Sequence, residues 1–127
     1  MTRYLEEHTF NFDNVFGEDY SNQQIYLECV QPLVLATFQG AKTTCFAYGQ
    51  TGSGKTHTMM GNPATQVPGL YLLAAQDIFS LMQESQFGDL FAVVSFYEIY
   101  CAKLFDLLNN REQLQCREDA KQVSMCF

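Results

Sequence analysis

One run of eight consecutive residues in this 127-residue chain has the residue types and spacing best suited to chemistry. Residues 49–56 match Gly-x4-Gly-Lys-[Ser/Thr], a pattern that wraps the backbone around phosphate groups. Its glycines allow tight turns that bring backbone N–H groups against phosphate oxygens. Lys55 supplies a positive charge for β- and γ-phosphates, and the Thr56 hydroxyl is suited to bind Mg²⁺. The predicted phosphate-binding residues are therefore Gly49, Gln50, Thr51, Gly52, Ser53, Gly54, Lys55 and Thr56.

A strand before this loop and a helix after it must position it. Residues 43–48 are β-branched, aromatic and apolar without alternation, which is typical of a strand buried on both faces of a parallel sheet. A helix is predicted from about 25 to 38, because apolar residues recur there at helical spacing. Ser21 and Gln24 have the spacing of a capping box at its start, and Gly40 ends the run.

Further elements extend this into an α/β pattern. Residues 9–16 alternate apolar and polar side chains and are predicted to form a strand. Residues 70–86 fit a second helix, and residues 90–100 a long strand. The stretch 114–127 predicts two short strands around a polar turn at 118–121. Pro32 falls inside the first predicted helix and should kink it.

Composition excludes several classes of protein. The formal net charge is −7, which argues against a nucleic-acid footprint, since that needs clustered Lys and Arg. The chain start does not have the form of a signal peptide, and no apolar run approaches the length of a membrane span. The five cysteines lack a Cys-x-x-Cys pair, so we expect neither a metal site nor a disulfide framework, and a reducing intracellular compartment.

The residues around the loop are more specific than the loop itself. Residues 46–59 read FAYGQTGSGKTHTM and resemble the signature of the kinesin motor head almost letter for letter. Three further stretches resemble the family as well: Phe12-Asp13 with Val15-Phe16, VSFYEIY at 94–100, and FDLL at 105–108. The resemblance runs from about residue 4 to residue 123. It implies a kinesin-type phosphate-loop NTPase fold, with a central, mostly parallel sheet flanked by helices.

The resemblance also implies the ligands. Kinesins are ATP-driven microtubule motors, so residues 49–56 would bind ATP and Mg²⁺, with Thr56 as the metal ligand. His57 would lie against the adenine ring. Without the family, His57 reads as a solvated histidine on a first helical turn. Microtubules would be the partner and the cytoplasmic cytoskeleton the location, with no nucleic acid and no membrane.

Within the family, the chain resembles the internal-motor, microtubule-depolymerising branch. The similar stretches are TRYLE at 2–6, KTTCFAY at 42–48, KLFDLL at 103–108 and LQCRED at 114–119. That branch carries a Lys-Val-Asp motif upstream of the region resembled. The motif does not occur in this sequence, so depolymerising activity cannot be assigned to these residues.

Other family motifs are also not found in residues 1–127, which we therefore expect to be a partial motor domain. They are the Arg-x-Arg-Pro adenine motif, the two nucleotide switches and the microtubule-binding elements. No catalytic residue is identified, and Glu98 reads as a structural acid at a strand end. The family implies ATPase activity, but we expect this chain alone to be inactive. We also expect the strand at 43–48 to lack its neighbours in the sheet.

Two other functions are compatible with a phosphate loop. One is a different phosphate-loop enzyme, such as a small-molecule kinase, which would need a second carboxylate-bearing strand and a substrate lid. The other is a non-catalytic interaction module. The quoted motifs favour the ATP-binding portion of a kinesin over both.

Overall fold

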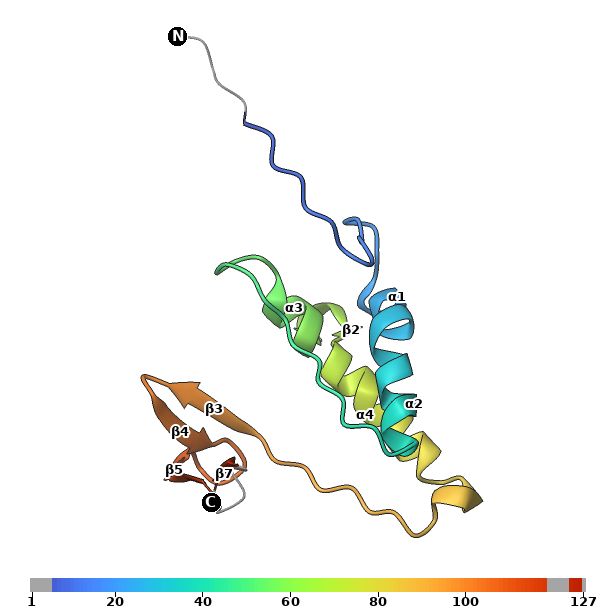
Figure 1. Ribbon diagram of the computed structural model, residues 1–127, viewed down its shortest axis with the longest axis vertical. Helices are drawn as coiled ribbons and strands as arrows, with labels where there is room; N and C mark the ends of the chain where they lie inside the picture. Colours follow the sequence, from blue (N-terminus) through green and yellow to red (C-terminus); the bar gives the residue numbers. More distant parts are fainter. Residues whose placement is uncertain (1–5, 119–123, 127) are drawn as a thin grey trace. The chain divides into compact units, whose positions relative to one another are not determined.

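The computed structural model describes residues 6–118 and 124–126. The chain divides into two compact units, Met1–Asp89 and Leu90–Phe127. The elements of the first unit are α1 (Asn22–Ile25), a π-helical turn (Tyr26–Val30), α2 (Gln31–Phe38), α3 (Lys55–Met60), β1 (Gly61–Asn62), a 3₁₀ turn (Pro63–Thr65), β2 (Val67–Pro68), α4 (Leu70–Leu81) and a 3₁₀ turn (Ser85–Phe87) (Figure 1). Those of the second unit are β3 (Tyr97–Tyr100), β4 (Lys103–Asp106), β5 (Glu112–Leu114), β6 (Cys116–Glu118) and β7 (Ser124–Cys126).

The first predicted helix is confirmed, and so are the signals at its two ends. The Ser21 hydroxyl accepts from the Gln24 N–H, and the Gln24 side chain accepts from the Ser21 N–H at 2.9 Å, which completes the capping box. At the other end Gly40 has φ 90°. Its N–H donates to the Thr37 carbonyl, and the Ala41 N–H donates to the Ala36 carbonyl. This pair of bonds satisfies the last carbonyls of α2.

The helix is irregular directly ahead of Pro32, where it forms a π turn. Pro32 has no N–H, so it cannot donate to the carbonyl four residues earlier. In the π turn the Gln31 N–H donates to the Tyr26 carbonyl, five residues back. The prolyl residue itself sits in the first turn of α2, where a missing donor costs little.

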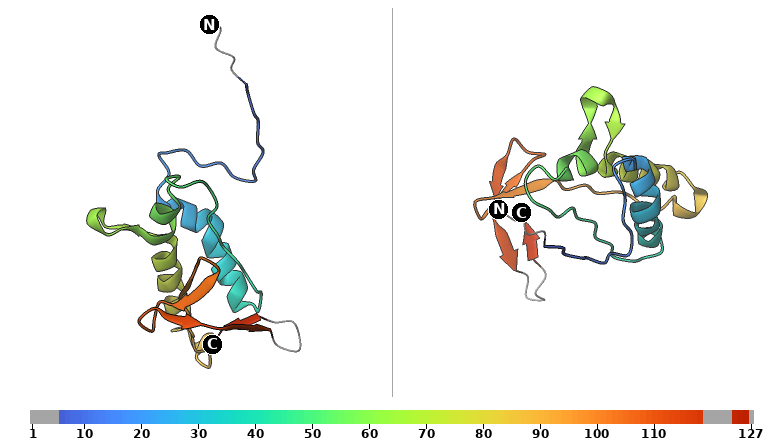
Figure 2. Two further views of the ribbon diagram at one scale, coloured as in Figure 1. Left: turned by 90° about the vertical axis from the view of Figure 1, so that its left-hand side faces the viewer. Right: turned by 90° about the horizontal axis from the view of Figure 1, so that it is seen from above.

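The core of the first unit lies between α4 and the helix formed by α1, the π turn and α2. Tyr26 and Val30 pack there against Leu70 and Leu73, and all four side chains are buried. α4 runs beside the longer helix, and the hairpin of β1 and β2 projects from the helices (Figure 2). The second predicted helix is therefore confirmed as far as Leu81. None of the described helices is long and apolar enough to cross a membrane.

Two of the predicted strands are wrong, and a third is much shorter than predicted. Residues 9–16 and 43–48 form no strand, and of 90–100 only β3 does so. A strand needs a partner for its N–H and C=O groups, and the described residues offer none here. Phe12 and Phe46 are accordingly 70% and 79% exposed. None of the sheets among the described residues includes 43–48.

The second unit consists of small antiparallel sheets. β4 pairs with β3, through Tyr97 opposite Asp106, and with β5, through Leu104 opposite Leu114. β6 pairs with β7, which confirms two short strands within 114–127; residues 119–121 of the predicted turn lie outside the described residues. The mixed α/β composition is thus confirmed, although every sheet among the described residues is antiparallel.

Candidate nucleotide-binding site

The predicted phosphate loop connects an extended segment to α3, and glycine is required at both of its ends. Gly54 has φ 90° and caps α3, whose first hydrogen bond runs from the Thr58 N–H to the Gly54 carbonyl. A Cβ atom placed on Gly49 would lie 2.6 Å from the Ser53 hydroxyl oxygen. Between them the Ser53 N–H donates to the Gln50 carbonyl at 3.2 Å. The loop therefore curls tightly before the helix begins.

The Lys55 side chain connects the end of this loop to its first residues by hydrogen bonds. Its ammonium group donates to the carbonyls of Gly49 and Gln50, each at 2.7 Å. An ammonium group has three donors, so these two bonds hold the charge beside the first residues of the loop. The side chain is half-buried, which places a positive charge next to backbone amides that can also face an anion.

A cavity of about 350 Å³ lies inside the loop, lined by Thr51, Gly52, Gly54, Lys55 and Thr56. The structure thus brings together five of the predicted phosphate-binding residues around one space. His57 does not line this cavity, and its side chain is exposed. In the described part of the chain, no three His, Cys, Asp or Glu side chains gather as a metal site. Thr56, the predicted Mg²⁺ ligand, is among the residues that line the cavity.

A family model, the kinesin motor domain, matches residues 1–126. The chain belongs to the kinesin motor domain family. It is 55% identical over 124 residues to Kinesin-like protein KIF24 of Mus musculus and 52% identical to that of Homo sapiens. Each match covers 97% of this chain and 9% of the relative, so the chain spans about 9% of the length of these curated relatives. The alternative of a small-molecule kinase is wrong.

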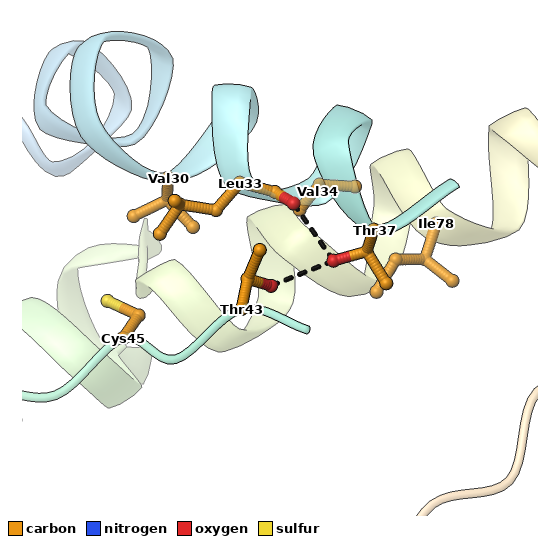
Figure 3. Close-up of a pocket in the computed structure, with 7 residues that line it drawn as sticks. All are labelled: Val30, Leu33, Val34, Thr37, Thr43, Cys45 and Ile78. Atoms are coloured by element: carbon orange, nitrogen blue, oxygen red, sulfur yellow. Dashed lines mark hydrogen bonds between the residues drawn. The ribbon is translucent and has the colours of Figure 1, made fainter. Parts of the chain in front are cut away.

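In this kinesin chain the segment ahead of the loop is attached to α2 by side chains. The Thr37 hydroxyl donates to the Leu33 carbonyl at 2.9 Å and lies 2.8 Å from the Thr43 hydroxyl (Figure 3). An apolar cavity of about 280 Å³ remains between helix and segment, lined by Val30, Leu33, Val34, Thr37, Thr43, Cys45 and Ile78. A pair of hydroxyls thus fixes the approach to the phosphate loop where a sheet ladder was expected.

Glu98 has a structural partner in the kinesin chain. It lies in β3, and its carboxylate accepts from Nε of Arg111. The same guanidinium group lies 4.9 Å from the centre of the Phe105 ring. This arrangement agrees with the interpretation of Glu98 as a structural acid of the sheet.

Two polar side chains of the first unit make hydrogen bonds that sequence reasoning missed. Asn22 is 4% exposed, and its amide donates to the carbonyls of His57 and Pro68. The Tyr26 hydroxyl donates at 2.7 Å to Asp77 of α4. Burial, together with the hydrogen bond to this carboxylate, raises the pKa of Tyr26 well above its ordinary value. Tyr26 belongs to the run at helical spacing, but the partners of both side chains lie 35 to 51 residues away, where no local pattern reveals them.

Proposed function

We propose that residues 1–127 are the phosphate-binding part of a kinesin motor domain, and that they bind ATP together with Mg²⁺. In the complete protein this binding would serve ATP hydrolysis coupled to microtubule-based movement or depolymerisation. The observation that carries the proposal is a full Gly-x4-Gly-Lys-Thr pattern, inside a kinesin family match, at the start of a helix. The proposed nucleotide-binding residues are Gly49, Gln50, Thr51, Gly52, Ser53, Gly54, Lys55, Thr56 and His57.

Each part of the loop has a distinct task in this proposal. The amides of 49–54 and the start of α3 face the phosphate oxygens. Lys55 would exchange its bonds to loop carbonyls for bonds to β- and γ-phosphate oxygens, which are stronger acceptors because they are charged. The Thr56 hydroxyl would be the protein ligand of Mg²⁺, which neutralises phosphate charge. These residues bind and orient the nucleotide; none of them activates the attacking water.

The partner and location follow from the family. We propose microtubules as the partner of the complete protein and the cytoplasmic cytoskeleton as its location. The net charge of −7 makes residues 1–127 unsuited to bind nucleic acid or an acidic filament by themselves. Contact with tubulin would therefore come from other parts of a complete head.

Within the family we propose the internal-motor, microtubule-depolymerising branch. The supporting stretches are KTTCFAY at 42–48, directly before the loop, and KLFDLL at 103–108, which includes β4. Addition of the complete protein and ATP to stabilised microtubules tests this: shortening filaments support the branch, and filaments that glide without shortening contradict it.

The replacement of Lys55 by alanine in a complete head that carries this segment tests the proposed function. Loss of the charge beside the β- and γ-phosphates should abolish ATP turnover in a steady-state assay. Lys42→Ala is the matched control, because Lys42 is exposed and makes none of the described hydrogen bonds to the loop. A Lys55→Ala head that turns over ATP near the parent rate would contradict the assignment.

The adenine contact of His57 has its own test. His57→Ala should weaken ATP binding by about 1 kcal/mol, the scale of one aromatic contact, while binding of bare Mg²⁺–triphosphate stays unchanged. Titration calorimetry with both ligands measures the difference. Equal losses for both ligands would mean that His57 acts on the loop and not on the base.

A further inference from the structure

The buried amide of Asn22 is an unusual feature of the first unit. Among the polar and charged residues that the structure describes, Asn22 is buried, with 4% of its surface exposed. Its Nδ2 donates at 2.9 Å to the His57 carbonyl and at 3.0 Å to the Pro68 carbonyl. Both amide hydrogens are thereby used, so the side chain is held in one orientation.

The first of these bonds fixes the helix that carries the proposed ligands. α3 has only six residues, Lys55–Met60, and a helix this short is not stable by itself. Its first three residues are Lys55, Thr56 and His57, which are all proposed nucleotide ligands. Since Asn22 binds the backbone of the third, a shift of α3 against α1 would displace the other two.

The second bond fixes the return of the chain from α3 to α4. The hairpin of β1 and β2 makes this return, and Pro68 is its last residue. The backbone there is crowded: a Cβ on Gly69 would lie 2.3 Å from the carbonyl carbon of Met60. The end of α3 and the start of α4 therefore move together, and Asn22 attaches both to α1.

We propose that Asn22 is a positioning residue for the phosphate site: its amide sets the place of α3 and, through it, of Lys55 and Thr56. This inference rests on the proposed function, because it assumes that these two residues bind phosphate and Mg²⁺. Small displacements of such groups are costly, since binding and reaction both depend on near-ideal placement. Asn22 touches no proposed ligand atom and acts only through the backbone of α3.

The test compares two buried hydrogen bonds of the same helix. Asn22→Ala removes the bonds to α3 and β2, whereas Tyr26→Phe removes the bond to Asp77 of α4 and leaves α3 attached. Binding of Mg²⁺–triphosphate to complete heads is measured by calorimetry, at a temperature where circular dichroism shows every variant folded. We expect Asn22→Ala to weaken binding about tenfold and Tyr26→Phe less than twofold, although both lower the melting temperature.

Two results would overturn the proposal: parent-like triphosphate binding by Asn22→Ala, or an equal loss in Tyr26→Phe, which would reduce Asn22 to a packing role. If Asn22→Ala does not fold, Asn22→Ser replaces it. Serine is uncharged and small, and its single hydroxyl hydrogen cannot serve both carbonyls, so a loss in the same direction is expected and parent-like binding again overturns the proposal. Lys55→Ala runs alongside, because unchanged triphosphate binding in that variant would refute the proposed function itself.

Discussion

The two units use different residue types at positions of positive φ. In the first unit positive φ occurs mostly at glycines, including Gly54 in the phosphate loop and Gly61 at the end of α3. In the second unit the described positive-φ residues are not glycines: they are Cys101, Ala102, Asn110 and Arg111, in two hairpin turns. A Cβ on Gly49 or Gly61 would also overlap neighbouring atoms, whereas Gly40, Gly52 and Gly54 have positive φ with open space around them. Turns that only reverse a hairpin accept a Cβ and its conformational cost.

The units also differ in how their elements are held. The first has buried side chains between helices, among them Tyr26 and Leu73. In the second, none of the described side chains of 90–116 is buried, and the strands are held by ladder bonds and by the pair of Glu98 and Arg111. Packing should therefore dominate the stability of the first unit, and local conformation that of the second.

The largest expected effect is at Gly61 of the first unit, a glycine that is both crowded and at positive φ. Gly61→Ala would place Cβ 2.3 Å from the Val67 carbonyl oxygen at φ 80°. Overlap and backbone strain together should cost about 4 kcal/mol of unfolding free energy, measured by urea unfolding through the helical circular-dichroism signal. Gly17→Ala is the control, because that Cβ meets nothing within 4 Å and the change should cost about 0.5 kcal/mol at most. Similar values for both would remove the contrast between crowded and open turns.

The next effect tests the difference in packing. Leu73 is 5% exposed in the helical core, so Leu73→Ala should cost about 3 kcal/mol. Leu104 of β4 is only half-buried, and Leu104→Ala should cost about 1 kcal/mol. Urea unfolding measures both. A larger cost for Leu104 would mean that the sheet has a core of its own.

A smaller effect, confined to the first unit, depends on pH. The raised pKa of Tyr26 means that the folded chain keeps a phenolic proton that the unfolded chain releases above about pH 10. The stabilisation is complete below pH 10 and falls above it, by up to about 1.4 kcal/mol per pH unit. Tyr26→Phe should remove this part of the loss of unfolding free energy above pH 10. A variant whose alkaline decline matches that of the parent would show that Tyr26 is not its source.

The smallest expected effect is a gain in stability, and it concerns a turn of the second unit. Ala102 has φ 60° in the two-residue turn between β3 and β4, a conformation that glycine adopts without cost. Ala102→Gly should therefore stabilise the hairpin by about 1 kcal/mol. Thermal unfolding followed by the β-sheet signal measures it. A loss of stability would show that this turn is not limited by its backbone.

Local signals predicted local structure well in this chain. The capping box at Ser21, the stop at Gly40 and the loop that opens α3 all depend on neighbours within a few residues, and the structure has each of them. The strands predicted at 9–16 and 43–48 were wrong because a strand depends on partners that alternation cannot reveal. Asn22 was missed for a related reason, since its two acceptors lie 35 and 46 residues away.

The π turn between α1 and α2 has a consequence for helical phase. The buried residues Asn22, Tyr26, Val30 and Val34 are spaced four apart. Since a residue turns about 100° in an α-helix, each step of four overshoots a full turn by about 40°, and three steps drift by about 120°. A π turn absorbs about one extra residue, or roughly 100°, which brings Asn22 back to the face of Val34. Deleting a single residue between 26 and 30 would therefore rotate Asn22 away from α3 without touching the phosphate loop.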